Sequence, residues 1–144
     1  KDSLFKNPVL RWFFTKCHQI PVYRGTDKAK DSLLAAADAI KEGACICFYP
    51  EATISSTTEL LPLKSGALRL AQNSGVEIVV VGTYGAHRIW TKGSGLRLKF
   101  RTRHTIIVSK AYKVEPDKDL ELAKTELAQK MTELVNIAKQ RQGK

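Results

Sequence analysis

Three histidines, His18, His87 and His104, are the side chains best suited to move a proton near neutral pH. His18 directly follows Cys17, but neighbouring residues on a helix or strand face different ways, so this spacing favours a structural role. His104 lies in a basic run that is typical of a solvated strand edge. His87 precedes Arg88 in a glycine-flanked loop, where a functional role and a structural one both stay open. No histidine has a convincing catalytic partner.

The cysteines and glycines exclude several other chemistries. Cys17, Cys45 and Cys47 are an odd number without metal-type pairs, which indicates reduced thiols in a cytoplasmic protein. Cys45 and Cys47 lie in an apolar run, so we expect small core residues and not metal ligands. The glycine motifs of nucleotide hydrolysis and dinucleotide binding are absent from the sequence.

Length and composition predict one globular domain. The chain has 144 residues, 43% of them apolar and 26% charged, and a net charge of +10. The positive charge favours an anionic partner, whether nucleic acid, a phospholipid surface or a phosphorylated small molecule. The longest apolar runs fall well short of the ~20 residues that span a bilayer. Because residue 1 is a lysine, we expect the domain, residues 1–144, to be truncated at its N-terminus.

The sequence predicts four helices. Asn7 and Pro8 predict a helix start before an apolar aromatic segment, and Asp27 and Gly43 bound a second helix. A third helix is expected over residues 64–74, with Gly75 as its stop. An amphipathic helix is expected over residues 119–141 at the C-terminal end.

Between the helices we expect strands. Residues 20–23 predict a short strand, and the runs 44–49 and 76–83 predict strands buried on both faces. Alternating residues 96–101 predict a strand with one basic face, and residues 105–109 predict another. This order predicts an α/β fold with a mostly parallel central sheet flanked by helices. Ligands of such folds bind beyond the carboxyl ends of the strands, where Arg24 and Glu51 stand.

The sharpest motif covers residues 48–55, Phe-Tyr-Pro-Glu-Ala-Thr-Ile-Ser. It resembles the third conserved block of the glycerolipid acyltransferases, in particular the 1-acylglycerol-3-phosphate acyltransferases, which usually reads Phe-Pro-Glu-Gly-Thr-Arg-Ser. Pro50, Glu51, Thr53 and Ser55 match this block. Alanine stands at position 52 in place of the usual glycine, and isoleucine stands at position 54 in place of the usual arginine.

Other blocks of that family follow in order. Residues 1–8 are similar to its Lys-x-x-Leu-Phe-x-x-Pro, and residues 20–24 to its second block, which ends in arginine. Residues 64–67 are similar to its Lys-x-Gly-Ala helix start, and residues 75–81 to its fourth block without the usual prolines. The resemblance runs from Lys1 to about Trp90 and implies an acyltransferase-like fold.

The family's first block, H-x-x-x-x-D, is absent from this sequence, because Tyr23, Lys92 and Ser109 stand at that spacing after the three histidines. In the family its histidine is the general base and its aspartate orients the histidine. The resemblance therefore implies that no catalytic residue lies in this chain, that the block lies upstream of Lys1, and that the chain alone is inactive.

The resemblance assigns the remaining residues to the acceptor, because a phosphate dianion needs fixed cations and donors. Arg24 and Lys64 would supply charge, and Thr53 and Ser55 would donate hydroxyl hydrogen bonds. Glu51 would accept a hydrogen bond from a substrate hydroxyl or hold a neighbouring arginine, with a helix-cap or surface role as the alternative.

The implied reaction is acyl transfer from acyl-CoA or acyl carrier protein to the free hydroxyl of a lysophospholipid, with 1-acylglycerol-3-phosphate as the expected acceptor, in phospholipid biosynthesis. No metal or tightly bound cofactor is implied. We expect a peripheral protein at the cytoplasmic face of an anionic membrane. The alternative is a non-catalytic basic domain that binds phospholipid or nucleic acid, and nucleic acid is disfavoured because Phe100 alternates away from the basic strand face.

Two surface features bear on membrane contact. Basic residues between Lys92 and Lys113 could lie against anionic lipid, and a solvated strand face explains them equally well. For the aromatic run Trp12, Phe13 and Phe14, core packing is the simpler interpretation, and contact with a membrane interface or an acyl chain is the alternative.

Overall fold

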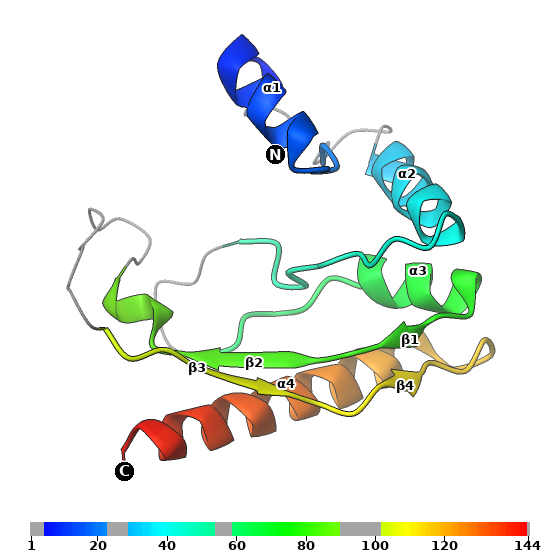
Figure 1. Cartoon of the computed structure of the whole chain (residues 1–144). Helices are drawn as coiled ribbons and strands as arrows, with labels where there is room; N and C mark the ends of the chain where they lie inside the picture. Colours follow the sequence, from blue (N-terminus) through cyan, green and yellow to red (C-terminus); the bar gives the residue numbers. More distant parts are fainter. Residues whose placement is uncertain (1–4, 23–28, 54–58, 90–101, 144) are drawn as a thin grey trace. The chain divides into compact units, whose positions relative to one another are not determined.

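The structure, a computed structural model, describes residues 5–22, 29–53, 59–89 and 102–143 (Figure 1). The chain divides into two compact units, Lys1–Cys47 and Phe48–Lys144. The first unit carries helices α1 and α2. The second carries α3, α4 and four short strands.

Two helices form the first unit, as predicted. Helix α1 spans Pro8–Lys16, and the Asn7 side chain caps it by accepting hydrogen bonds from the backbone of Val9 and Leu10. Helix α2 spans Ala29–Lys41. The half-buried hydroxyl of Ser32 donates to the Pro21 carbonyl over 2.9 Å, which ties α2 to the chain before it. Residues 20–22 form no strand, so the described part of the strand predicted at 20–23 is wrong.

The second unit begins at Phe48 with a loop that leads into α3, which spans Gly66–Ser74. Gly75 ends this helix in the left-handed conformation, at φ 64°, as a C-terminal glycine commonly does. The Gln72 side chain donates to the carbonyls of Glu115 and Lys118, over 3.0 and 2.9 Å. These bonds fix α3 to the turn that precedes α4.

Four short strands pair in two antiparallel ladders. Strand β1 (Glu77–Ile78) pairs with β4 (Tyr112–Lys113), and β2 (Val81–Tyr84) pairs with β3 (Thr105–Val108). Between the ladders Val79 and Val80 stand opposite three residues, 109–111, so the register shifts by one. Ser109 spans this bulge: its hydroxyl accepts from the Val80 amide, and its own amide donates to the Val80 carbonyl.

Helix α4 (Leu120–Gln142) packs along one face of these strands (Figure 1). The core between them contains buried apolar side chains from the loop, α3, the strands and α4: Leu63, Leu68, Val80, Val114, Ala123 and Leu127. Gly82 lets α4 approach closely, because a Cβ there would lie 2.5 Å from the Leu134 Cβ. At the far end, the Gln142 side chain donates to the carbonyls of Tyr84 and Arg103 over 2.8 and 2.9 Å.

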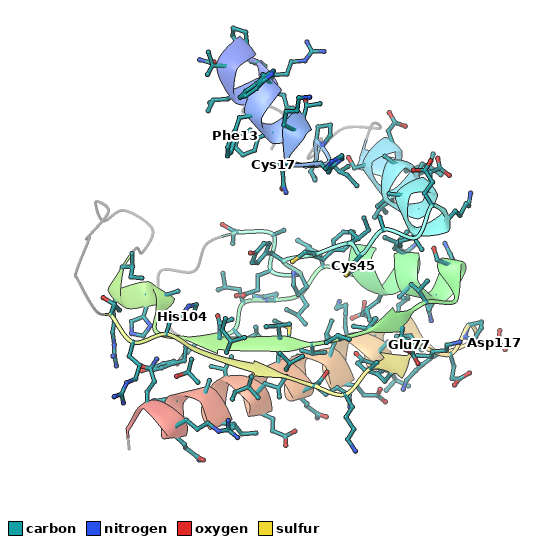
Figure 2. All side chains as sticks on the ribbon, in the orientation of Figure 1. Phe13, Cys17, Cys45, Glu77, His104 and Asp117 are labelled. Atoms are coloured by element: carbon teal, nitrogen blue, oxygen red, sulfur yellow. The ribbon has the colours of Figure 1, made fainter. Side chains whose placement is uncertain are left out.

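The predicted sheet differs from the observed one. The described strands pair only antiparallel, and residues 44–49 form no strand, so the buried strand predicted there is wrong. A strand needs hydrogen-bonding neighbours, and an apolar run by itself does not supply them. Cys45 and Cys47 are exposed rather than core residues. Figure 2 labels Cys45. The run 76–83 is split by the bulge and buried on one face only. The strand predicted at 96–101 lies outside the described residues.

Candidate functional site

The sharpest sequence motif folds as a tight turn followed by a closed loop. The amide of Ala52 donates to the carbonyl of Tyr49 over 2.9 Å, which defines a four-residue turn. Pro50 occupies the second position of this turn, where its fixed φ is favourable. The turn directs the chain into a loop that returns at residues 61–64.

Two hydrogen bonds join the ends of this loop. Oε2 of Glu51 accepts from the Leu61 amide over 2.9 Å, and the Pro50 carbonyl accepts from the Lys64 amide over 2.8 Å. Leu63, between the two donors, is buried in the core. Glu51 is itself half-buried, so its carboxylate is a structural acceptor that holds the loop shut.

Ala52 adopts φ 54°, the left-handed conformation that residues with a Cβ rarely occupy. This is the position where the resembling family has glycine. The turn geometry therefore accounts for glycine in the family, and alanine makes the same turn here at a cost in backbone strain of roughly 1–2 kcal/mol.

Lys64 lies at the returning end of the loop, two residues before α3 begins at Gly66. The Lys64 amide donates to the Pro50 carbonyl, and the neighbouring Leu63 is buried, so the backbone of Lys64 is fixed. Lys64 is nevertheless exposed to solvent. Ser65 caps α3 without a side-chain hydrogen bond. Lys64 thus stands beside the positive end of a helix dipole, and both features favour an anion.

The structure brings two of the five predicted site residues together. Glu51 and Lys64 stand at opposite ends of the closed loop, joined through the backbone bonds described above. Thr53 lies just past the turn and is exposed. Arg24 and Ser55 lie outside the described residues, so their roles stay predictions of the sequence.

None of the three histidines lies beside a catalytic partner among the described residues. His18 follows the end of α1 at φ 52°, and its amide donates to the Thr15 carbonyl, so it terminates the helix. The ring of His87 packs against the ring of Tyr84, with the two ring centres 5.0 Å apart. The Arg88 guanidinium lies 5.8 Å from the centre of the Tyr84 ring. His104 is exposed. The cluster around Tyr84 was not predicted from the sequence, although its glycine-flanked loop was noted.

Metal sites and membrane-spanning helices are absent from the described residues. Among the described residues, no three His, Cys, Asp or Glu side chains gather where they could hold a metal ion. In the same part of the chain, no helix has both the length and the apolar character needed to cross a bilayer. A shallow hollow along the outer face of α4, lined by Thr125, Gln129 and Glu133 among others, contains no cationic side chain and does not suit a phosphate.

The sequence model of the family described as "Acyltransferase" matches residues 1–84, which include the closed loop. The chain belongs to the acyltransferase family. The fold of the chain is similar to that of the 1-acyl-sn-glycerophosphate (LPA) acyltransferase PlsC from Thermotoga maritima. The two structures superpose with a TM-score of 0.79, and their sequences are 19% identical. That similarity covers 96% of this chain and 54% of PlsC, and it shows the fold alone.

Curated relatives share the family. The chain is 29% identical over 132 residues to the chloroplastic 1-acyl-sn-glycerol-3-phosphate acyltransferase BAT2 of Brassica napus, which covers 91% of this chain and 38% of the relative. It is 30% identical over 95 residues to the chloroplastic enzyme LPAT1 of Arabidopsis thaliana, covering 65% of this chain and 27% of that one. A 1-acyl-sn-glycerol-3-phosphate acyltransferase of Limnanthes alba is 33% identical over 112 residues, or 76% of this chain and 38% of the relative. The chain therefore spans less than half the length of these relatives.

Proposed function

We propose that the protein containing this chain transfers an acyl group from a thioester, acyl-CoA or acyl carrier protein, to the free hydroxyl of 1-acylglycerol-3-phosphate in phospholipid biosynthesis. The observation that carries the proposal is the family match over residues 1–84, which includes a loop whose ends hold Glu51 and Lys64. The printed names of the curated relatives support the acceptor. The acyl donor follows from the sequence resemblance alone.

In this reaction the acceptor oxygen attacks the thioester carbonyl, a C–O bond forms, and the C–S bond breaks. The acceptor proton passes to a general base and then to the leaving thiolate, so no oxidant and no metal or tightly bound cofactor is required. The family's H-x-x-x-x-D block, which supplies that base, is absent from these 144 residues. Its place upstream of Lys1 stays a prediction, as does the inactivity of the chain alone.

The contribution of the described residues is to bind and position the acceptor. Lys64 offers a solvent-exposed cation at the N-terminal end of α3, where a phosphate monoester would also meet the helix dipole. The Glu51–Leu61 bond ties the segment 61–64, from which Lys64 projects, to the turn at Pro50. We assign Glu51 a positioning role in place of direct contact with the substrate. Arg24, Thr53 and Ser55 are further predicted acceptor contacts.

The acceptor is a membrane lipid, so we also propose that the protein works as a peripheral protein on an anionic membrane at its cytoplasmic face. The net charge of +10 supports attraction to such a surface. A non-catalytic phospholipid-binding domain is the alternative. The family match favours the enzyme over that alternative and over a nucleic-acid-binding domain.

The test uses the full-length protein, expressed with whatever coding sequence precedes Lys1. Thiol release from acyl-CoA should depend on added 1-acylglycerol-3-phosphate. Lys64→Ala should raise the KM for this acceptor by about tenfold or more, because one charge-assisted hydrogen bond is lost. Lys139→Ala removes an exposed lysine on α4, away from the loop and from the basic stretch between Lys92 and Lys113, and is the matched control. Lipid binding without thiol release would favour the binding module, and an unchanged KM would remove Lys64 from the acceptor site.

A further inference from the structure

Within its own unit, helix α1 presents an apolar face that no described residue covers. Val9, Trp12 and Phe13 are 72%, 65% and 50% exposed, and their spacing of three and four residues places them on one side of the helix. Helix α1 has no buried residue. The interpretation of Trp12 and Phe13 as core residues is therefore wrong for the described chain.

The aromatic side chains of α1 are not all alike in this respect. The ring of Phe14 lies 5.8 Å from that of Phe5, and both residues are half-buried. The chain before the helix thus folds back to shield Phe14, while Trp12 and Phe13 stay exposed. Phe13 is labelled on α1 in Figure 2. The exposed face is a separate feature from this local aromatic pair.

The charges around the exposed face have one sign. Lys6, Arg11 and Lys16 lie in or beside α1 and are all exposed. The sequence contains no acidic residue between Asp2 and Asp27. An apolar aromatic face with a basic surround is complementary to a surface that is apolar inside and negatively charged outside.

We propose that α1 lies in the interface of an anionic phospholipid bilayer, with Trp12 and Phe13 inserted at the level of the headgroups and Lys16, which follows them on the same face, against a lipid phosphate. A bilayer fits better than a protein partner, because indole and phenyl rings favour the headgroup region and anionic lipid neutralises the basic side chains. The inference deepens the proposed function, on which its membrane setting rests, and it names the element that makes contact.

The experiment uses Trp12 as its own probe in the full chain. Trp12 and Trp90 are the two tryptophans, so Trp90→Phe leaves Trp12 alone. Its emission is recorded with vesicles of phosphatidylcholine, with or without phosphatidylglycerol, and with brominated lipid as quencher. We expect a blue shift and quenching that require the anionic lipid. In co-sedimentation, Phe13→Ser should weaken partitioning by about tenfold or more.

Leu34→Ser is the matched control, because Leu34 on α2 is 63% exposed and should leave vesicle binding unchanged. Arg11→Glu with Lys16→Glu should remove the preference for anionic lipid, and circular dichroism checks that the variants stay folded. Three outcomes would overturn the proposal: Trp12 emission indifferent to vesicles, emission already shifted in their absence at every protein concentration, or a shift that tracks protein concentration and so reports self-association.

Failure here and failure of the proposed function are distinguishable. Vesicle binding is measured without acyl transfer, and acyl transfer is measured in the full-length protein with a short-chain acceptor dissolved in water. Phe13→Ser should leave that soluble reaction unchanged while weakening reaction on vesicles. Equal loss of both reactions would contradict a role confined to the membrane interface.

Discussion

At position 52 a side chain occupies a backbone conformation that usually belongs to glycine. The turn that begins at Tyr49 ends at Ala52, whose amide closes the turn and whose φ is 54°. The cost of the Cβ is local, because the turn is held on one side by Pro50 and on the other by the closed loop. Replacement of Ala52 by glycine therefore changes the backbone strain while removing only one methyl group.

Ala52→Gly should raise the free energy of unfolding by about 0.5–1 kcal/mol, because relief of left-handed strain exceeds the extra entropy of glycine in the unfolded chain. Urea unfolding measures the change. Ala67→Gly, inside α3, is the control and should lower stability by about 1 kcal/mol. A loss of stability in Ala52→Gly would show that the turn is not strained.

Glu51 allows a structural role to be separated from a substrate contact. Glu51→Gln keeps a side-chain oxygen acceptor for the Leu61 amide, whereas Glu51→Ala removes it. We expect hydrogen exchange of the Leu61 amide to accelerate by about tenfold in Glu51→Ala and to change little in Glu51→Gln. Equal exchange in both variants would contradict the loop-closing role.

The sequence motif identified Pro50 and Glu51 as important, but it did not identify what Glu51 contacts. Its partner is a backbone amide ten residues later, and backbone amides carry no side-chain signature. The sequence predicts for Glu51 a hydrogen bond to a substrate hydroxyl, support of a neighbouring arginine, or a helix-cap or surface role, and none of these names the Leu61 amide. The helix predicted from Lys64 begins two residues later, at Gly66, so Lys64 stands just before α3.

Among the elements, the contact of α4 with β2 depends on the absence of one side chain. A Cβ on Gly82 would lie 2.5 Å from the Leu134 Cβ and 2.7 Å from its backbone carbon. Because backbone atoms are among these neighbours, rotation of a side chain cannot relieve the clash. The helix must move as a body to admit even a methyl group.

Gly82→Ala should therefore lower the free energy of unfolding by about 1–3 kcal/mol. Chemical denaturation followed by circular dichroism measures this loss. Gly143→Ala adds the same methyl at the end of α4, where the nearest atom would be 3.7 Å away, and should leave stability within about 0.5 kcal/mol. Similar effects in both variants would refute the packing argument.

Tyr112 on β4 links the small sheet to α4 and to pH. Burial, and then the nearby Glu126 carboxylate, raise the pKa of the Tyr112 phenol above its ordinary 10.0. The Lys130 ammonium lies 4.9 Å from the ring centre. The folded state holds the phenol proton more tightly than the unfolded state does, so this stabilisation is complete below pH 10.0 and is lost as pH rises through the folded pKa.

We expect the free energy of unfolding to fall more steeply between about pH 9 and pH 11 in the unchanged chain than in Tyr112→Phe. Urea unfolding at several pH values in this range gives the slope of the free energy of unfolding against pH for each protein. The other tyrosines and lysines titrate in both proteins, so their contributions cancel in the difference between the two slopes. Parallel slopes would mean that the Tyr112 phenol titrates as it does in the unfolded chain.

Helices were predicted better than strands. Asn7, Asp119 and Gly75 mark helix ends in the sequence and do so in the structure, because caps and stops act within one turn. Strand pairing depends on partners far along the chain. The Val80–Ser109 bulge and the antiparallel pairing of β2 with β3 depend on such distant residues, and the apolar run 44–49 could not reveal whether a partner strand would meet it.

At the scale of the whole molecule, burial is uneven between the two units. In the first, Ala36 and Ser32 are the buried residues among those described, whereas the second has a core shared by loop, helices and strands. We expect native-state hydrogen exchange to be slowest in β2, β3 and the middle of α4 and at least about tenfold faster throughout α1. Uniform protection of both units would contradict this ranking.

The two hydrogen bonds from Gln142 set an order of events during synthesis on the ribosome. The Tyr84 carbonyl is made 58 residues before the side chain that binds it, an interval of roughly 3–12 s at 5–20 residues per second. Until Gln142 leaves the exit tunnel, the β2–β3 pair lacks the last turn of α4 across its open end. The second unit is therefore completed only when residue 142 has emerged, and until then the face of β2 and β3 that α4 covers is incompletely shielded in the nascent chain.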